Sequence, residues 1–187
     1  MGNSLSDLGQ GALADAASVV GKLDPAAFEA FAQVIAGAKR IALHGLGREG
    51  LQMKGLAMRL FHLGLDAHAV GEMTTPPVGK GDLLIVSAGP GYFATIESLM
   101  MIAKNAGAKT AVVTAQPKGG LARMANHVLH IPAQTMADDQ GAKTSVLPMG
   151  SLFEVSMMLA FELLVLRLRD LVGESAESMR ARHTNLE

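Results

Sequence analysis

The sequence predicts an α/β fold in which a parallel sheet of five strands is covered by helices on both faces. Short apolar runs alternate with segments of helical periodicity, and glycines lie where a strand would pass into a helix. Because the runs are apolar throughout rather than alternating with polar residues, a sheet buried on both faces is favoured.

Two helices are expected before the first strand. Residues 4–37 are rich in alanine and carry apolar residues at helical spacing. This stretch divides at Asp24-Pro25, where Asp24 can cap a helix and Pro25 can take the first helical position. The sequence IALHGLG then predicts a strand with a glycine loop, and REGLQMKGLAMRLFHLG predicts the helix that follows.

The alternation continues through the middle of the chain. DAHAV, GDLLIVSAG and AKTAVVTA are expected to be the second, third and fourth strands, and ATIESLMMIAKNAG a helix that ends at Gly107. A short helix near residues 121–124 leads to HVLHIP, the expected fifth strand, which Pro132 closes.

The last third contains one long connection and two helices. Residues 133–148 show no period and are long for a connection, so we expect a lid or a subunit-contact loop. Residues 149–171 form a helix that is apolar around most of its circumference and ends at Gly173, and ESAESMRARHTNLE forms one more. A helix this apolar needs burial on most sides, and a monomer of 187 residues has little interior to bury it. We therefore expect it to pack against the same helix of another subunit in a homo-oligomer, a dimer or tetramer.

Composition bounds the class of protein. The chain has 187 residues, enough for one domain over residues 1–187 with N-terminal helices at 4–37 and C-terminal helices at 149–184. A net charge of −1, no run of like charges, six Phe, one Tyr and no Trp argue against binding to nucleic acid or an anionic membrane. The absence of cysteine, of a signal segment and of an 18-residue apolar run predicts a cytoplasmic protein. No cluster has metal-ligand spacing, so no metal is expected.

Two glycine loops are the first candidate site. Residues 45–50 fit G-x-G-x-x-G, which leaves open a dinucleotide site or a tight turn without a ligand. The strand that should end in an acidic ribose-binding residue ends in Val70, with Glu72 just beyond. A second loop, VSAGPGYFAT at 86–95, follows the third strand. Two such loops on adjacent carboxyl ends of a parallel sheet would line one crevice, in which a polar ligand could lie.

Two titratable residues have competing explanations. Ser151 and Glu154 match a capping box at the start of the long helix, but a carboxylate at the open end of the sheet could also be a general base. His183 lies between arginines near the chain end, which fits a solvated cation or an acid–base group.

Several motifs together resemble one family. GLGREGL, VGEMTTP, PMGSLFE and the closing RHTNLE are similar to the 6-phospho-3-hexuloisomerases of the sugar isomerase (SIS) domain superfamily, over roughly residues 25 to 187. The resemblance implies a doubly wound three-layer α/β/α sandwich of the flavodoxin-like or Rossmann-like type, usually tetrameric. It also implies isomerisation of 3-hexulose 6-phosphate to fructose 6-phosphate through an enediolate, without a cofactor. Glu154 would then be the base, and His183 would assist at the oxygens, reaching in from a neighbouring subunit.

The phosphate loops depart from the family pattern. Similar isomerases carry S-G-S-G-E-T where this chain has residues 88–93, and G-x-G-R-S-G where this chain has Glu49 in the serine position. We therefore expect weak phosphate binding unless Arg48, Lys54 or Lys143 compensates, and an altered or non-phosphorylated sugar that rests on Tyr92 and Phe93. A non-catalytic module that senses a carbohydrate derivative is the alternative. The candidate substrate-binding residues are Gly47, Arg48, Glu49, Ser87, Ala88, Gly89, Pro90, Gly91, Tyr92, Phe93 and Thr114.

Overall fold

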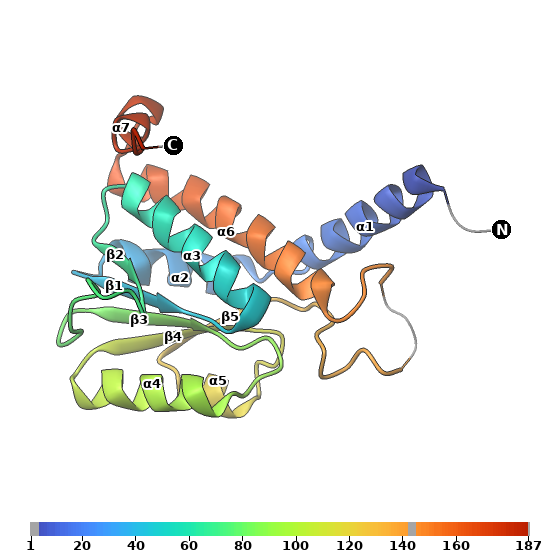
Figure 1. The fold of residues 1–187 in the computed structure, drawn as a ribbon, viewed down its shortest axis with the longest axis horizontal. Helices are drawn as coiled ribbons and strands as arrows, with labels where there is room; N and C mark the ends of the chain where they lie inside the picture. Colours follow the sequence, from blue (N-terminus) through green and yellow to red (C-terminus); the bar gives the residue numbers. More distant parts are fainter. Residues whose placement is uncertain (1–3, 142–144, 187) are drawn as a thin grey trace.

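The computed structural model describes residues 4–141 and 145–186, and its centre is one five-stranded sheet (Figure 1). All paired strands are parallel, in the order β2-β1-β3-β4-β5. This confirms the predicted parallel α/β sheet and is the flavodoxin-like strand order. The strands are β1 (Ile41–His44), β2 (Ala67–Ala69), β3 (Leu83–Ser87), β4 (Lys109–Thr114) and β5 (His127–His130).

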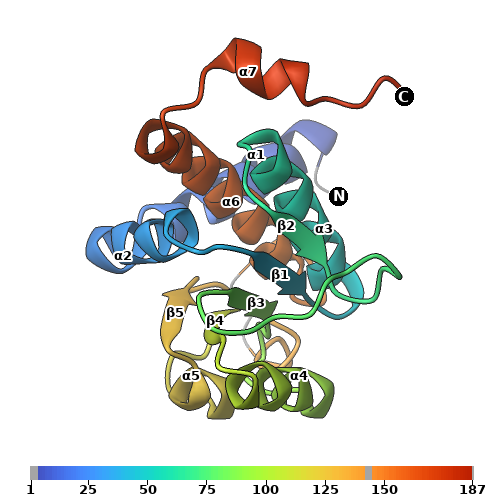
Figure 2. The ribbon, with the colours of Figure 1, turned by 90° about the vertical axis from the view of Figure 1, so that its left-hand side faces the viewer.

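Helices cover both faces of the sheet, which gives the three layers. Figure 2 shows α4 and α5 below the sheet, whereas α1, α2, α3 and α6 lie above it. Each face has its own apolar core, and β3 is buried along its whole length. The helices are α1 (Leu5–Val20), α2 (Pro25–Ala36), α3 (Gly47–His62), α4 (Ala94–Asn105), α5 (Gly120–Met124), α6 (Ser151–Val172) and α7 (Ala176–Ala181).

Local sequence signals explain where the first helices begin. Asp24 accepts hydrogen bonds from the backbone N–H groups of Ala26 and Ala27, and Pro25 is the first residue of α2, as predicted. Ser4 and Asp7 form a reciprocal capping box at the start of α1. These contacts satisfy N–H groups that would otherwise lack partners in the first helical turn.

The long helix α6 is buried along one face and bare along another. Its inner face, which includes Phe153, Met157 and Leu164, packs into the core shared with α2 and α3. Its outer side chains are apolar but exposed by 40 to 56%, and they are Val155, Met158, Leu159, Leu163 and Leu166. We call these five residues the outer face of α6. Within the described residues, no helix is long and apolar enough to span a membrane.

Candidate active site

The two glycine loops meet where the strand order reverses. After β1 the chain moves outward to β2 and then returns to β3 on the other side of β1, so β1 and β3 are neighbours with His44 paired to Val86. Ligands of open α/β sheets bind in the crevice outside the carboxyl ends at such a point. A pocket of about 560 Å³ lies there, as expected from the two loops. It is lined by Leu46, Gly47, Arg48, Glu49, Pro90, Phe93, Thr135, Met136, Met149, Gly150, Phe153 and Glu154.

Three helices begin at this pocket. The residues that precede α3, α4 and α6 are Leu46, Phe93 and Gly150, and none of them caps its helix with a side-chain hydrogen bond. All three line the pocket. Because helix N-termini carry partial positive charge, this end of the sheet favours negatively charged groups. The protein supplies two of its own, the carboxylates of Glu49 and Glu154.

Glu154 lines the pocket, and only one of its two carboxylate oxygens has a polar partner among the described residues. Its Oε1 lies 3.2 Å from Nη2 of Arg48, and its side chain is 15% exposed. Its Oε2 is buried and has no hydrogen-bond partner in the described part of the chain. Burial raises the pKa of Glu154, and the nearby Arg48 guanidinium opposes this rise. A half-buried carboxylate with a raised pKa and a spare oxygen is suited to accept and return a proton.

The capping-box interpretation of Glu154 is wrong. Gly150, not Ser151, precedes α6, and it has a left-handed conformation with φ 73°. A Cβ at Gly150 would lie only 2.7 Å from the backbone nitrogen of Met136, so the close approach of that segment requires a glycine. Ser151 is already inside the helix, and its hydroxyl accepts a hydrogen bond from Nη1 of Arg48 at 3.0 Å.

Arg48 joins two of the helices at the pocket. It lies in the first turn of α3, and besides Ser151 and Glu154 it contacts the carbonyl oxygen of Met149, to which it donates a hydrogen bond. All of these partners lie in the first turn of α6 or just before it. Arg48 therefore orients Glu154 and fixes the position of α6 relative to the first glycine loop.

Glu49 reaches across to the second glycine loop. Its Oε2 accepts a hydrogen bond from the backbone N–H of Gly89 at 3.0 Å and another from the hydroxyl of Ser87. The residue is buried, with 7% of its surface exposed. Burial raises the pKa of Glu49 and the charge of Glu154 raises it further, whereas the hydrogen bonds from Ser87 and Gly89 lower it.

Other predicted residues support the loop rather than line the pocket. Ala88 is fully buried in the core. The hydroxyl of Thr114 donates to the carbonyl oxygen of Gly89 at 3.4 Å and accepts from the backbone N–H of Gln116 at 3.0 Å. Gly91 has φ 93°, and a Cβ there would lie 2.7 Å from Gln116. These residues shape the turn that presents Gly89 and Pro90.

The structure places the two residues of the predicted aromatic wall differently. Phe93 lines the pocket, but Tyr92 does not, because its hydroxyl donates a hydrogen bond to Oε2 of Glu97 at 2.7 Å. Of the lysines expected to compensate for lost phosphate contacts, Lys54 is exposed and does not line the pocket, whereas Lys143 lies outside the described residues.

His183 lies at the far end of α3 from the pocket. Its ring stacks on that of His62, the last residue of α3, with centroids 5.4 Å apart. The nearby Arg182 donates a hydrogen bond to the carbonyl oxygen of His62 and pairs with Glu174. At 1.5 Å per residue, α3 separates His62 from Gly47 by about 22 Å along its axis. Figure 1 shows α7 and the C-terminus beyond that end of α3. Glu154 and His183 of one chain are therefore not brought together.

Sequence reasoning did not identify several of the lining residues. Met136 and Thr135 belong to the long connection that was expected to be a lid or a subunit-contact loop, and Phe153 immediately precedes Glu154. Leu46 and Met149 also line the pocket. For Leu46, Met149 and Phe153 the available signal was their position next to the glycine loop or the start of α6, and for Thr135 and Met136 it was their place in the long connection.

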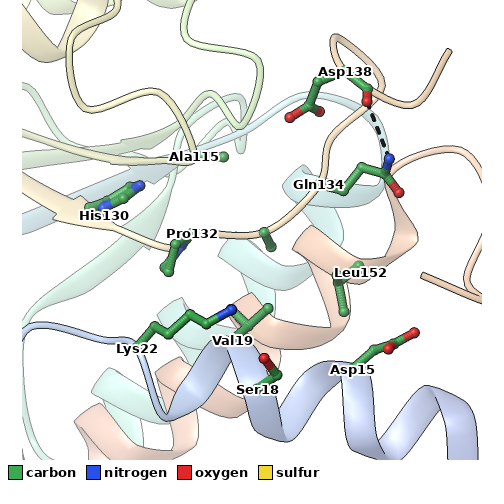
Figure 3. A pocket seen from close by; sticks show the side chains of 11 residues that line it. Asp15, Ser18, Val19, Lys22, Ala115, His130, Pro132, Gln134, Asp138 and Leu152 are labelled. Atoms are coloured by element: carbon green, nitrogen blue, oxygen red, sulfur yellow. Dashed lines mark hydrogen bonds between the residues drawn. The ribbon is translucent and has the colours of Figure 1, made fainter. Parts of the chain in front are cut away.

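A second pocket, of about 380 Å³, lies at the carboxyl ends of β4 and β5 against α1 (Figure 3). His130 and Lys22 line it together with two acids. Both acids accept hydrogen bonds from the long connection: Asp138 accepts them from Thr135, and Asp15 accepts them from Ser145 and Val146. This pocket lies away from the point where the strand order reverses, so we assign the candidate active site to the first pocket.

Comparison with known proteins places the chain in a family. Residues 34–159 match the SIS domain family, and the chain belongs to it. A 3-hexulose-6-phosphate isomerase of Mycobacterium gastri is 37% identical over 173 residues, which cover 92% of this chain and 86% of that protein. The enzyme of the same name from Bacillus subtilis is 36% identical over 143 residues, which cover 76% of this chain and 77% of that protein.

A solved structure agrees with these relatives. It belongs to a hypothetical protein of Methanococcus jannaschii for which a function of 3-hexulose-6-phosphate isomerase was inferred. The TM-score is 0.75 with 28% identity, and 86% of each chain is covered. The dinucleotide alternative gains no support from these relatives. The glycines of the first loop instead serve close packing, because a Cβ at Gly50 would lie 2.5 Å from the carbonyl oxygen of Gly45.

Proposed function

We propose that the protein is a cofactor-independent ketose isomerase that moves a carbonyl group between neighbouring carbons through an enediolate. The observation that carries this proposal is the half-buried carboxylate of Glu154, which has one oxygen without a partner and a guanidinium 3.2 Å from the other. Its setting, at the reversal of strand order in a SIS-domain chain, fits the activity for which the relatives are named.

The reaction needs two proton movements. In a 3-ketose, Oε2 of Glu154 removes the proton from C2, the hydroxyl-bearing carbon beside the carbonyl, and the electrons of the C–H bond form the C2–C3 double bond of an enediolate. Glu154 then returns the proton to C3, while the proton of the C2 hydroxyl passes to the oxygen on C3. The product is a 2-ketose, and nothing is oxidised or reduced overall. The guanidinium of Arg48 stabilises the developing negative charge on the oxygens.

The proton transfer between the oxygens is the role proposed for His183. Because His183 lies at the other end of α3 from Glu154, this role requires the tail of a second copy of the chain. The exposed outer face of α6 supports a homo-oligomer, a dimer or tetramer, since a row of bare apolar side chains on a helix gains stability when it is covered. We place this assembly, one SIS domain per chain, in the cytoplasm, as the cysteine-free composition suggests.

A non-catalytic sugar sensor is the second candidate. The observation that favours it is the contact of Glu49 with Ser87 and Gly89, which fills part of the second loop. A sensor needs no base, so the state of Glu154 separates the two functions. A sensor should bind sugars equally well with Glu154 replaced by Gln and should exchange no carbon-bound proton.

The test is proton exchange with solvent. Fructose and fructose 6-phosphate are incubated separately with the protein in D₂O, and incorporation of deuterium at C3 is followed by NMR. Conversion of 3-hexulose 6-phosphate to fructose 6-phosphate is measured in parallel. We expect exchange on at least one sugar, lost by a factor of about 10² to 10⁴ in Glu154→Gln. Glu162→Gln removes a carboxylate from the same helix outside the pocket and should retain the exchange. Equal exchange in wild type and Glu154→Gln would overturn the proposal.

A further inference from the structure

The polar end of the candidate site is already occupied by a side chain of the protein. Oε2 of Glu49 accepts hydrogen bonds from both the backbone N–H of Gly89 and the hydroxyl of Ser87. These are the two kinds of donor, a loop N–H and a small hydroxyl, that would hold an oxygen of an anionic ligand. The carboxylate is itself such an anionic group, and it reaches this place from the first turn of α3.

The other backbone donors of residues 88–91 are also in use. The N–H of Ala88 donates to the carbonyl oxygen of Val113, and that of Gly91 donates to the carbonyl oxygen of Ala88, each at 2.9 Å. Pro90 has no N–H. Residues 88–91 therefore have no backbone donor left for a ligand as long as Glu49 keeps its contact with Gly89.

The charged side chains of the pocket also disfavour an anion, in opposition to the partial positive charge of the three helix N-termini. An anion that approached this loop would meet Glu49 and, on the other side of the pocket, Glu154. The only arginine or lysine lining the pocket within the described residues is Arg48, and its guanidinium already contacts Ser151, Met149 and Glu154. Half of the lining consists of apolar residues, which suit the C–H faces of a sugar: Leu46, Pro90, Phe93, Met136, Met149 and Phe153.

From this geometry we infer that Glu49 takes the place of a substrate phosphate, so that the site selects a sugar that is uncharged at the end facing Glu49. A hydroxyl of that sugar donates a hydrogen bond to Oε1 of Glu49, which accepts none from the described residues. The inference rests on the proposed isomerase function and specifies its substrate class, a non-phosphorylated ketose. Glu49 is then the residue that determines specificity, while Glu154 carries the proton.

The experiment measures anion binding directly and needs no turnover. Inorganic phosphate is titrated into ¹⁵N-labelled wild type, Glu49→Ser and Glu49→Gln, and the amide signal of Gly89 is followed by NMR. Glu97→Gln is the matched control, because Glu97 is a carboxylate close in sequence to the same loop that does not line the pocket. Thermal unfolding of each variant verifies that it is folded. If Glu49→Ser does not fold, Glu49→Gln, which keeps the size of the side chain, still tests the inference.

We expect phosphate to leave the Gly89 signal of wild type and Glu97→Gln unchanged and to bind at least tenfold more tightly to Glu49→Ser. Glu49→Gln, which loses the charge but still fills the loop, should lie between them. The ratio of the affinity for fructose 6-phosphate to the affinity for fructose should likewise be at least tenfold higher in Glu49→Ser than in wild type. The inference fails if phosphate shifts the Gly89 signal in wild type, or if no Glu49 variant that folds gains affinity.

The two proposals can fail separately. If Glu154→Gln still exchanges substrate protons, the isomerase function is lost while the phosphate titrations retain their meaning. If wild type isomerises 3-hexulose 6-phosphate and prefers phosphorylated sugars at least tenfold, the isomerase function stands and the inference about Glu49 falls.

Discussion

Arg48 and Glu154 lie in the first turns of two different helices, α3 and α6, and Nη2 of the arginine lies 3.2 Å from Oε1 of the glutamate. Burial raises the pKa of Glu154, and the guanidinium limits that rise. The pair therefore sets the pH at which the carboxylate becomes available as a base, because only the deprotonated form can accept a proton from carbon.

Replacing Arg48 with Met should move the pH profile of the enzyme. Without the cation the pKa of Glu154 rises further, so the acid limb of kcat/KM should shift to higher pH. Arg59→Met is the control, since Arg59 pairs with Glu162 between the same two helices but outside the pocket. An acid limb that stays in place in Arg48→Met would show that the guanidinium does not tune this carboxylate.

Shortening the base should affect turnover more than binding. Glu154→Asp keeps the charge but withdraws the carboxylate by one carbon, and a misplacement of about 1 Å can cost about 10²-fold in rate. We expect kcat to fall by about that factor with KM little changed, in steady-state assays on whichever ketose the wild type converts. A rise in KM at constant kcat would instead indicate a binding role for Glu154.

Two glycines of α3 should respond in opposite directions to alanine. A Cβ at Gly50 would lie 2.5 Å from the carbonyl oxygen of Gly45, whereas a Cβ at Gly55 would meet nothing within 4 Å. Gly50→Ala should therefore destabilise the fold by about 1 to 3 kcal/mol. Gly55→Ala should stabilise it by about 0.5 to 1 kcal/mol, because alanine favours the helix. Urea unfolding measures both, and equal effects would contradict the close contact of Gly50 with the first strand-to-helix loop.

Acid should weaken the link between α2 and α6. Arg167 of α6 pairs with Glu29 of α2 at 2.6 Å, and this contact, together with a hydrogen bond from Gln33, lowers the pKa of Glu29 from 4.5 to about 2. A lowered pKa means that this pair stabilises the fold above about pH 4.5 and that its contribution is lost as pH falls through about 2. The contribution is small because both side chains are exposed.

We expect Glu29→Gln to reduce the dependence of Tm on pH in this acid range, measured by circular dichroism. Glu162→Gln, which removes an exposed carboxylate from a different ion pair, that with Arg59, is the control and should keep the wild-type slope. Identical slopes for all three proteins would show that the Glu29–Arg167 pair does not contribute to acid stability.

Charges on the outer face of α6 should dissociate the assembly. Met158 and Leu166 are 56% and 53% exposed. Their replacement by Glu would place charges in an apolar interface without partners. We expect Met158→Glu/Leu166→Glu to elute as a smaller species than wild type in size-exclusion chromatography with light scattering. Ile102→Glu, on α4 in the opposite layer and 63% exposed, should leave the mass unchanged. A wild-type monomer would remove the basis for a role of His183 from a second copy.

The secondary structure could be predicted from local signals. Asp24 with Pro25 marks the start of α2, Gly107 follows the end of α4, and the apolar runs gave all five strands at their observed places. The location of the crevice also followed from the two glycine loops, because parallel strands present their carboxyl ends at one edge of the sheet.

The finer features of the site depend on contacts that sequence spacing does not show. Glu49 binds Ser87, which is 38 residues away, and Tyr92 turns from the pocket toward Glu97. Gly150, which lies close to Met136, precedes α6, so the spacing of Ser151 and Glu154 placed the cap one residue too late. Such tertiary contacts override the local preferences on which spacing arguments rest.

The bond from Glu49 to Gly89 has one more consequence, for the thermodynamics of binding. It joins the first turn of α3 to the loop after β3 across the reversal point, so both walls of the pocket are held together in the unliganded protein. A ligand would therefore enter a preorganised cleft and lose little affinity to the ordering of a loop. Association should show a small conformational-entropy penalty and an unchanged backbone around Gly89, the behaviour of a rigid receptor rather than of an induced fit.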